Sequence, residues 1–383
     1  MKTKIVFMVI NMNVGGTEKS LLNLIATLPE DKYEITIVML EKCGGFLPFI
    51  PKRVHVHYID EYPKIRRMIH DPPKKVMKQL VQEKQFIKIL TFTTVLLLSK
   101  VLKRKNVFLN YVLKNTPDLE GKYDVAMAYA GPMDLISYFI IKKVNAKRKV
   151  QWVHFDVTKI GFDKQFATTC YRSFDRILVV SNEGKDILTS TLPRLFYKIG
   201  TYINPISSDL IIKMANSGEG FEQNSHFNGV RILTVGRLCN QKGQDLAIPV
   251  LARLKEAGFS VKWYCIGEGS ARRNLEERIK KYGIEKEFIL LGTKINPYPY
   301  MKQCDLYVQP SRHEGYCITL AEAKCFDKPI ISTNFTGVHE HITHEKTGLV
   351  VSFDYEEVYT AIKRVIGNGL RINPEPKTAG DRQ

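Results

Sequence analysis

The sequence lacks the patterns that mark disulfide-stabilised, zinc-binding or membrane-spanning proteins. Its seven cysteines are scattered and odd in number, and no two stand in a C-x-x-C spacing. This argues against a disulfide framework and a structural zinc site, and for a reducing compartment. The longest uncharged apolar run in the basic region, ILTFTTVLLL at 89–98, has ten residues, whereas a bilayer span needs about 20. We therefore expect no transmembrane helix.

The N-terminus also lacks the form of a signal peptide. The apolar run in MKTKIVFMVINMNVGG is short and leads directly into Asn11 and a Gly-Gly turn, so a first buried strand is the better interpretation. At 383 residues the chain is too long for one ordinary core and suits two domains. Its composition, 44% hydrophobic and 25% charged, is typical of a globular protein.

Acidic residues are scarce in the first half of the chain. Residues 1–204 hold 33 Lys and Arg against 18 Asp and Glu, a net charge of +15, whereas residues 205–383 hold 24 against 21, a net charge of +3. Such an asymmetry favours a polyanionic partner, either nucleic acid or an anionic membrane leaflet.

The segment 64–115 carries much of this charge. It has thirteen Lys and Arg against Asp71 and Glu83, with apolar residues at roughly helical spacing. It is either a solvated helical hairpin packed on a sheet or a basic membrane-surface segment, and the concentration of charge favours the membrane. Because it lacks the aromatic interleaving of a stacking platform, we expect no nucleic-acid partner.

Apolar runs alternate with helical patterns in both halves of the chain. In the first half, strands are expected at 5–10, 33–40, 123–130, 148–155 and 176–181. The first strand leads into a helix whose apolar face is expected to hold Leu21, Leu22, Ile25 and Leu28. After YINPIS at 202–207 the alternation restarts, with strands expected at 230–238, 261–269, 288–292, 305–310 and 328–333. Helices are expected at 243–258, 271–283 and about 356–366.

Such alternation predicts an α/β fold with two doubly wound parallel-sheet domains facing across a cleft. We expect the domains to span residues 1–204 and 205–366, with the hinge near Asn204-Pro205. The remaining residues, 367–383, have few apolar side chains and are expected to form a disordered tail.

Two loops at expected strand ends suit an anion. In NVGGTEKSLL (13–22), Gly15 and Gly16 let the backbone approach a ligand where a helix begins. The loop is neither G-x-G-x-x-G nor a Walker loop, so a tight strand-to-helix turn explains it equally well. In VGRLCNQKG (235–243), Arg237 and Lys242 lie at and just past a strand end, which favours diphosphate binding over the alternative of two solvated surface cations.

The stretch PSRHEGYCITLAEAKCFDKPI (310–330) holds two glutamates eight positions apart. Glu314 lies in a polar loop that Gly315 lets bend, and Glu322 lies just inside the next expected helix. Thr319 and Glu322 match a capping box, which accounts for Glu322 alone. The amides that would surround a phosphate at the helix start belong to Tyr316, Cys317, Ile318 and Thr319. Carboxylates on both sides of a diphosphate site suit the hydroxyl groups of a nucleotide sugar.

Taken together, these motifs resemble those of the retaining GT-B glycosyltransferases of the GT4 family, also called glycosyl transferases group 1. The likeness rests on Glu314-x7-Glu322, Gly15-Gly16, GRL followed by Lys242-Gly243, GEGSARRNLEE, and NP at the domain join, and it spans residues 1 to about 366. It is closest to bacterial members that build capsular, exopolysaccharide or teichoic-acid glycans. The resemblance implies that residues 1–204 bind the acceptor and residues 205–366 bind the nucleotide sugar.

The resemblance also implies roles for individual residues. Glu322 would hold the ribose hydroxyls and Glu314 would sit at the donor sugar, while His154 in QWVHFD would approach that sugar from the N-terminal domain. The nucleobase would lie along LGTK (291–294), which includes Thr293. The diphosphate would be held by Arg237, Lys242 and the amides of Gly16, Thr319 and Leu320. The catalytic set would be His154, Glu314, Arg237 and Lys242.

The implied function is transfer of a hexose-type sugar, with UDP as the expected nucleotide, to a lipid-linked or polysaccharide acceptor. We expect a cytoplasmic protein peripheral on the inner face of the cell membrane. No D-x-D occurs, and HEHITH (339–344) does not have H-E-x-x-H spacing, so we expect neither a metal nor another cofactor. The C-terminus departs from the family, whose members usually end in a helix or two that brace the N-terminal domain.

Two other functions remain as alternatives. A non-catalytic partner subunit of a second glycosyltransferase would keep the fold and the basic first half. A nucleotide-sugar epimerase shares the architecture, but the Glu-x7-Glu segment favours transfer.

Overall fold

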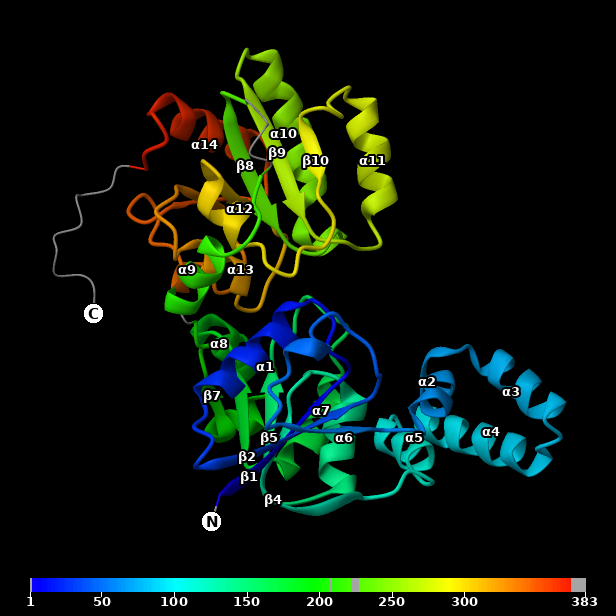
Figure 1. Ribbon diagram of the computed structural model, residues 1–383. Coiled ribbons are helices and arrows are strands. Elements are labelled where there is room, and N and C mark those ends of the chain that lie inside the picture. Colours follow the sequence, from blue (N-terminus) through cyan, green and yellow to red (C-terminus); the bar gives the residue numbers. More distant parts are fainter. Residues whose placement is uncertain (1, 207, 222–226, 373–383) are drawn as a thin grey trace. The chain divides into compact units, whose positions relative to one another are not determined.

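The computed structural model describes residues 2–206, 208–221 and 227–372, and it divides into two compact units (Figure 1). One unit comprises the chain up to Asn13 together with Thr17–Ile203, and the other comprises Val14–Gly16 together with the chain from Asn204 onward. Each unit contains its own parallel sheet, so the predicted α/β architecture with two sheets is confirmed. Residues 373–383 of the expected tail lie outside the described residues.

The first unit is built on a seven-stranded sheet in the order β3-β2-β1-β4-β5-β6-β7, with every neighbouring pair parallel. Its strands are β1 (Thr3–Val9), β2 (Tyr33–Met39), β3 (His55–Tyr58), β4 (Leu119–Ala128), β5 (Val144–Val153), β6 (Arg176–Val179) and β7 (Ile199–Thr201). Its helices beside the sheet are α1 (Gly16–Thr27), α6 (Asp134–Lys143), α7 (Lys164–Cys170) and α8 (Asn182–Thr191), and its 3₁₀ turns are η1 (Leu47–Phe49), η2 (Tyr171–Ser173) and η3 (Pro193–Lys198). The sequence pattern did not predict β3 and β7, which have only four and three residues.

The N-terminal strand and the first helix lie where the sequence places them, and the buried face of the helix overlaps the expected one at Leu21 and Ile25. Helix α1 buries Ser20, Leu21, Leu24 and Ile25, whereas the expected face included Leu22 and Leu28. The buried positions follow an i, i+3, i+4 spacing, which defines one side of a helix. Ser20 is buried because its hydroxyl accepts a hydrogen bond from Tyr129 Oη at 2.8 Å.

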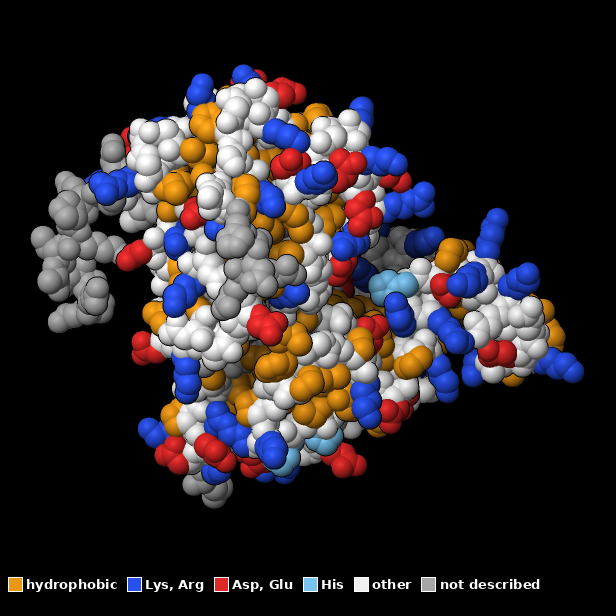
Figure 2. Space-filling view, turned by 45° about the horizontal axis from the view of Figure 1, so that its top comes forward, with side chains coloured by type: hydrophobic (Ala, Val, Ile, Leu, Met, Phe, Trp, Pro, Cys, Tyr) orange, Lys and Arg blue, Asp and Glu red, His pale blue; other side chains and the backbone are white. Residues whose placement is uncertain are grey.

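The basic segment forms four helices that stand out from the sheet of the first unit (Figure 1). They are α2 (Tyr62–His70), α3 (Pro73–Gln82), α4 (Phe86–Val101) and α5 (Lys105–Val112), and we call them the helical appendage. Figure 2 shows Lys and Arg side chains spread over this appendage, between apolar groups. Helix α4 buries only Phe92, so the alternative of a hairpin that packs its apolar face on the sheet fails for this helix.

The second unit has a six-stranded sheet in the order β10-β9-β8-β11-β12-β13, again parallel throughout. Its strands are β8 (Val230–Val235), β9 (Val261–Ile266), β10 (Phe288–Leu290), β11 (Leu306–Gln309), β12 (Ile330–Thr333) and β13 (Leu349–Val351). Its helices are α9 (Ser208–Asn216), α10 (Gln244–Glu256), α11 (Arg272–Lys281), α12 (Tyr298–Gln303), α13 (Ile318–Ala323) and α14 (Tyr355–Gly367), with 3₁₀ turns η4 (Asn240–Lys242) and η5 (Val338–Glu340).

Alternate residues of β8 feed two separate apolar cores in the second unit. Ile232 packs with residues of α10, α11 and α14, whereas Leu233 and Val235 pack with residues of α12 and α13. This alternation is the period of two expected of a strand covered on both faces. The sheet therefore lies between two helical layers, with apolar side chains on both of its faces.

Among the described residues, no helix is both long enough and apolar enough to cross a bilayer.

Candidate active site

The predicted donor-site residues of the second unit gather at one edge of its sheet. Strands β8 and β11 are parallel neighbours, and the chain leaves β8 in one direction across the sheet and returns at β11 on the other side. Such a reversal point, at the carboxyl ends of the strands, is where open α/β sheets bind ligands. The loop after β8 carries Arg237 and Lys242, and the loop after β11 carries Glu314.

A glycine brings these two loops into contact. Gly243 has a φ of +69°, and a Cβ atom built on it would lie 1.8 Å from the carbonyl oxygen of Pro310. Only a residue without a side chain fits such a close approach. Lys242, which precedes this glycine, is thereby fixed beside the loop that begins at Pro310.

Lys242 and Glu314 form a nearly buried ion pair. Lys242 Nζ lies 2.6 Å from Glu314 Oε1, and only 14% and 7% of the two side chains are exposed. Burial, the largest single influence, lowers the pKa of Lys242, but the charge and hydrogen bond of Glu314 and the influence of Cys317 together outweigh it, so the net pKa of the ammonium is above its ordinary value. The ammonium is therefore charged at neutral pH. Since an ammonium has three N–H donors, two remain after the bond to Glu314 for an anion or for other acceptors.

A chain of buried polar side chains fixes Glu314 from behind. Tyr307 Oη donates to Gln309 Oε1 at 2.8 Å, and Gln309 Nε2 donates to Ser311 Oγ at 2.9 Å. Ser311 Oγ donates in turn to Glu314 Oε1 at 2.7 Å. A fully satisfied buried network of this kind restrains the carboxylate to one position.

A second set of contacts ties the two loops together, and the sequence analysis did not foresee it. Arg312 makes a bidentate pair with Asp245, with both N–O distances at 2.7 Å. The Gln241 carbonyl accepts a hydrogen bond from the Arg312 amide at 2.8 Å, and Gln241 Nε2 donates one to the His313 carbonyl at 3.0 Å. These partners lie about 70 positions apart, so no local sequence signal could have paired them.

Glu322 does not form the capping box that the sequence suggested. Helix α13 begins at Ile318, after Cys317 in the left-handed conformation at the N-cap position. Thr319 therefore lies inside the helix, and Glu322, fully buried, accepts a hydrogen bond from Tyr298 Oη at 3.0 Å. The capping prediction is wrong because the loop ends in a left-handed cysteine two residues before Thr319.

The other predicted donor-site residues of this unit have varied surroundings. Arg237 is exposed, and its carbonyl accepts a hydrogen bond from Gln244 Nε2 at 3.0 Å. Thr293 is exposed after β10, and Gly315 is buried in the loop that follows β11. The Leu320 amide already donates to the Cys317 carbonyl at 3.0 Å, so this conformation does not offer it to a diphosphate.

Near this edge, the surroundings of Cys317 and Tyr316 limit what these two side chains can do. Burial raises the pKa of the Cys317 thiol to about 12, with a further contribution from Glu314, so the thiol is protonated and a poor nucleophile at neutral pH. The Tyr316 ring lies 4.4 Å from that of His341, and its carbonyl contacts His341 Nε2.

Two of the three histidines of HEHITH, His341 and His344, make contacts within the second unit. Besides the contact of His341 with Tyr316, His344 Nδ1 accepts a hydrogen bond from the Val350 amide at 3.0 Å. Within residues 2–206, 208–221 and 227–372, no group of three or more His, Cys, Asp and Glu side chains is arranged to hold a metal ion.

Gly15 and Gly16 lie between β1 and α1, after the end of β1 at the point where the strand order of the seven-stranded sheet reverses, since β1 and β4 are neighbours there. Gly16 is the first residue of α1, and a Cβ atom there would meet no other atom within 4 Å. Local crowding therefore does not explain why this position holds a glycine.

His154, directly after β5, is almost fully buried in an aromatic setting. Its ring is 4.6 Å from that of Tyr129 and stacks at 5.9 Å on that of Trp152. Burial lowers the pKa of His154 to about 3, despite an opposing hydrogen bond with the Tyr129 backbone. Its Nε2 is buried without a hydrogen-bond partner in the described part of the chain. The imidazole is therefore neutral at neutral pH.

Comparisons with known proteins cover the part of the chain that carries these residues. Residues 220–378, which include every predicted donor-site residue of the second unit, match the family model of glycosyl transferases group 1. The amylovoran biosynthesis glycosyltransferase AmsD of Erwinia amylovora is 24% identical over 353 residues, which cover 91% of this chain and 85% of AmsD.

A second relative comes from Campylobacter jejuni and is named N-acetylgalactosamine-N,N'-diacetylbacillosaminyl-diphospho-undecaprenol 4-alpha-N-acetylgalactosaminyltransferase. It is 32% identical over 146 residues, 38% of this chain and 39% of that enzyme. The matches span between 32% and 63% of the length of the curated relatives other than AmsD.

Among solved structures, Anabaena Alr3699/HepE in complex with UDP-glucose shares the fold with a TM-score of 0.68 at 16% identity, covering 96% of this chain and 90% of HepE. The structural neighbours are GT-B glycosyltransferases, so the predicted GT-B fold is confirmed. Residues 220–378, which carry the Lys242–Glu314 pair, are thus similar to the glycosyl transferases group 1.

Proposed function

We propose that this protein is a retaining, metal-independent GT4 glycosyltransferase that transfers a hexose from a UDP-sugar to a lipid-linked or polysaccharide acceptor. The observation that carries the proposal is the buried Lys242–Glu314 pair at the reversal point of the second sheet. It provides a cation and a carboxylate side by side within the residues that match the family. These two charges match the two parts of a UDP-sugar, which are a diphosphate and a sugar ring that carries hydroxyl groups.

The donor would bind with its diphosphate against the cations and its sugar against the carboxylate. The free N–H groups of Lys242 and the exposed guanidinium of Arg237 would hold the diphosphate oxygens. Glu314 would accept hydrogen bonds from sugar hydroxyls, and Glu322 would accept them from the ribose. That the solved neighbour HepE binds UDP-glucose supports the choice of UDP.

The reaction breaks the bond between the anomeric carbon of the sugar and the leaving diphosphate oxygen, and forms a bond from that carbon to the acceptor oxygen. The acceptor hydroxyl gives its proton to the departing diphosphate on the same face of the sugar. Charge that develops on UDP is met by Arg237 and Lys242, which are already positioned and need not reorganise. The neutral His154 would donate or accept one hydrogen bond at the donor sugar.

An acceptor at the cytoplasmic face of the cell membrane fits the distribution of charge and of apolar groups. The helical appendage is strongly basic, and α4 exposes Ile87 and Leu90 to 81% and 70%. Basic and apolar groups together favour an anionic lipid surface. The names of the two curated relatives, one concerned with amylovoran and one with a diphospho-undecaprenol, support an acceptor used in cell-surface glycan synthesis.

The proposal is tested by measuring nucleoside-diphosphate release from UDP-, GDP- and ADP-sugars in the presence of anionic vesicles that bear a lipid-linked acceptor. We expect release from one UDP-sugar only, with the anomeric configuration retained in the product. Glu322→Gln should lower release at least tenfold, because loss of one hydrogen bond to a charged acceptor costs about 1.5–3 kcal/mol. The exposed Glu256→Gln is the matched control and should leave release unchanged.

Two outcomes would contradict the proposal. Vesicle binding without release from any donor would favour the non-catalytic partner subunit. Conversion of the nucleotide sugar to its epimer without release of UDP would favour the epimerase.

A further inference from the structure

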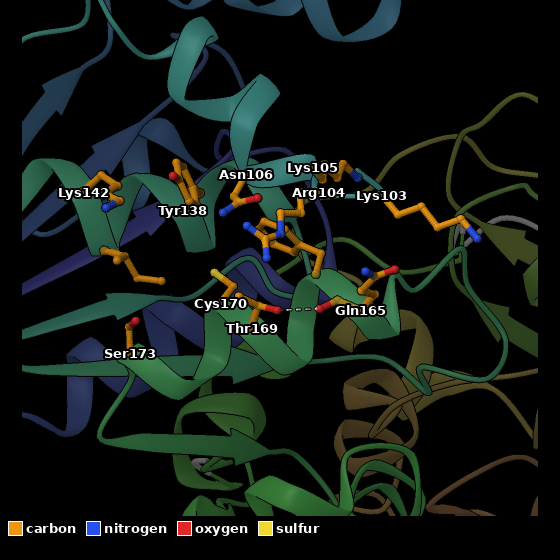
Figure 3. A pocket seen from close by; sticks show the side chains of 12 residues that line it. Lys103, Arg104, Lys105, Asn106, Tyr138, Lys142, Gln165, Thr169, Cys170 and Ser173 are labelled. Atoms are coloured by element: carbon orange, nitrogen blue, oxygen red, sulfur yellow. Dashed lines mark hydrogen bonds between the residues drawn. The ribbon is translucent and has the colours of Figure 1, made fainter. Parts of the chain in front are cut away.

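The first unit contains a pocket of about 460 Å³ at the root of the helical appendage. Its walls come from the start of α5 and the residues before it, from α6, and from α7 with the turn that follows (Figure 3). Four of the side chains that line it are cations: Lys103, Arg104, Lys105 and Lys142. This pocket lies wholly within one unit, and the donor-site residues have no part in it.

Most of this positive charge is not neutralised by the protein. Lys105 pairs with Asp134, the acid closest to it. Arg104 and Lys142 have no carboxylate partner in the part of the chain that the structure describes. In Figure 3 the guanidinium of Arg104 points into the middle of the pocket, Lys142 lies toward one end, and Lys103 extends away from the other. Two cations without a carboxylate partner beside one cavity suit an anionic ligand.

The rest of the pocket wall is uncharged: four polar residues, Asn106, Gln165, Thr169 and Ser173, share it with apolar and aromatic ones. The buried side chains of Phe166 and Cys170 line it, together with Tyr138. Burial raises the pKa of the Cys170 thiol to about 12, so the wall carries no thiolate to oppose an anion. Arg104 and Lys142 are themselves exposed, and the buried Phe166 and Cys170 lower the dielectric constant on one side of a phosphate bound between them.

An exposed apolar stripe leads directly to this pocket. Along α4, the exposed large residues are Phe86, Ile87, Leu90, Leu97, Leu98 and Val101. Their spacing of about three and four positions places them on one side of the helix. Leu102 is 51% exposed and immediately precedes Lys103 and Arg104. A soluble helix normally turns such a stripe inward, so its exposure beside an anion pocket calls for an amphiphilic occupant.

Lys103, which joins the end of α4 to the pocket, has an unusual backbone conformation. Lys103 has a φ of +51°, at the position after the α4 C-cap where glycine is preferred. A lysine there carries a steric cost that a glycine would avoid. The turn places Arg104 and Lys105 at the pocket as soon as the apolar helix ends.

We propose that this pocket binds the phosphate group of a polyprenyl-type lipid, with the phosphate against Arg104 and Lys142 and the hydrocarbon along the apolar stripe of α4. The proposal rests on the lipid-linked acceptor of the proposed function and names the site that holds its phosphate. The same cations would also accept a free phosphate or diphosphate, which the experiment separates from the lipid.

The test compares the affinity of the full chain for two kinds of phosphatidylcholine vesicle, one with phosphatidylglycerol and one with a polyprenyl diphosphate at equal negative charge. We expect at least about tenfold tighter binding to the polyprenyl diphosphate vesicles. Arg104→Gln with Lys142→Gln should abolish this preference. Lys78→Gln with Lys88→Gln removes two exposed appendage cations outside the pocket, so both affinities should fall while the preference stays.

Equal affinity of the unsubstituted protein for the two vesicles at matched charge would overturn the proposal, as would a preference that survives the Arg104 and Lys142 substitutions. Free pyrophosphate that binds as tightly as the vesicles would overturn the lipid assignment and leave a free anion as the ligand. UDP binding, measured on the same samples, separates this inference from the proposed function. Loss of UDP binding with an intact vesicle preference would count against the donor site alone.

Discussion

At the scale of single residues, the ion pair between Lys242 and Glu314 dominates the donor site. Both side chains are nearly buried, and each is the principal charge partner of the other. Breaking a buried pair leaves one uncompensated charge, which costs more than the pair itself contributes. The pair should therefore be important for the stability of the second unit as well as for ligand binding.

Glu314→Ala should lower the free energy of unfolding by about 3 kcal/mol, because it leaves the Lys242 ammonium buried without its partner. The double variant Lys242→Met with Glu314→Ala should recover most of this loss. Urea unfolding at neutral pH measures both. A single variant as stable as the unsubstituted protein would show that water reaches Lys242 in solution. The exposed Glu256→Ala is the control, expected within about 0.5 kcal/mol.

His154 should make the protein sensitive to mild acid. Burial lowers its folded-state pKa from 6.5 to about 3, so below pH 6.5 the unfolded chain takes up a proton that the folded chain refuses. Stability should then fall by about 1.36 kcal/mol per pH unit, or about 2 kcal/mol between pH 6.5 and 5.

His154→Phe should remove this part of the acid sensitivity, and the comparison of urea midpoints at pH 6.5 and 5 reveals it. The exposed His55→Gln serves as the control and should unfold with the pH dependence of the unsubstituted protein. If His154→Phe loses stability just as steeply, the imidazole is protonated in the folded state and cannot be the neutral group inferred here.

At the scale of secondary-structure elements, the site depends on how closely the loop after β8 approaches the end of β11. Gly243 permits this approach, since any side chain at that position would overlap the Pro310 carbonyl. Gly258, which follows α10, has a similar backbone with φ of +84°, but a Cβ atom there would meet no other atom within 4 Å. Substitutions at these two glycines can therefore distinguish the cost of a positive φ from the cost of steric overlap.

Gly258→Ala should cost about 1 kcal/mol of unfolding free energy, the effect of positive φ alone. Gly243→Ala should cost about 1–3 kcal/mol more, because it adds the overlap. It should also weaken UDP binding by moving Lys242. Thermal unfolding and calorimetric titration with UDP measure the two effects. Equal stability losses in the two variants would mean that the loop gives way at Pro310 without strain.

The helical appendage shows what an element-level pattern can and cannot predict. Charge and apolar spacing in residues 64–115 correctly indicated helices. They did not indicate that α4 would bury only Phe92 and turn its leucines outward. Which side of a helix faces inward depends on where the rest of the chain lies, and a short-range pattern does not contain that information.

At the scale of the whole molecule, each unit has its own sheet, its own apolar core and one tryptophan. Trp152 lies in the first unit and Trp263 in the second, and both are fully buried. Trp152→Phe and Trp263→Phe therefore yield proteins whose fluorescence follows one unit at a time.

UDP should stabilise the unit that reports through Trp263. At a concentration of 100 times the Kd, it should raise the free energy of unfolding by about 2.7 kcal/mol, since only the folded unit binds it. Urea unfolding of Trp152→Phe, with and without UDP, measures the shift. A shift reported by Trp152 alone, with none by Trp263, would place the nucleotide in the first unit and contradict the assignment of the site.

The sequence by itself determined the parallel α/β fold, because the alternation of buried strands and helices is a property of neighbouring residues. It also indicated the strand-end positions of Arg237, Lys242 and Glu314. Only the tertiary structure decided that Lys242 pairs with Glu314, that Tyr298 contacts Glu322, and that the basic segment frames a pocket. These contacts join residues between 24 and 72 positions apart. Such contacts depend on the order of strands in the sheet and on single close approaches such as that at Gly243, which no local pattern records.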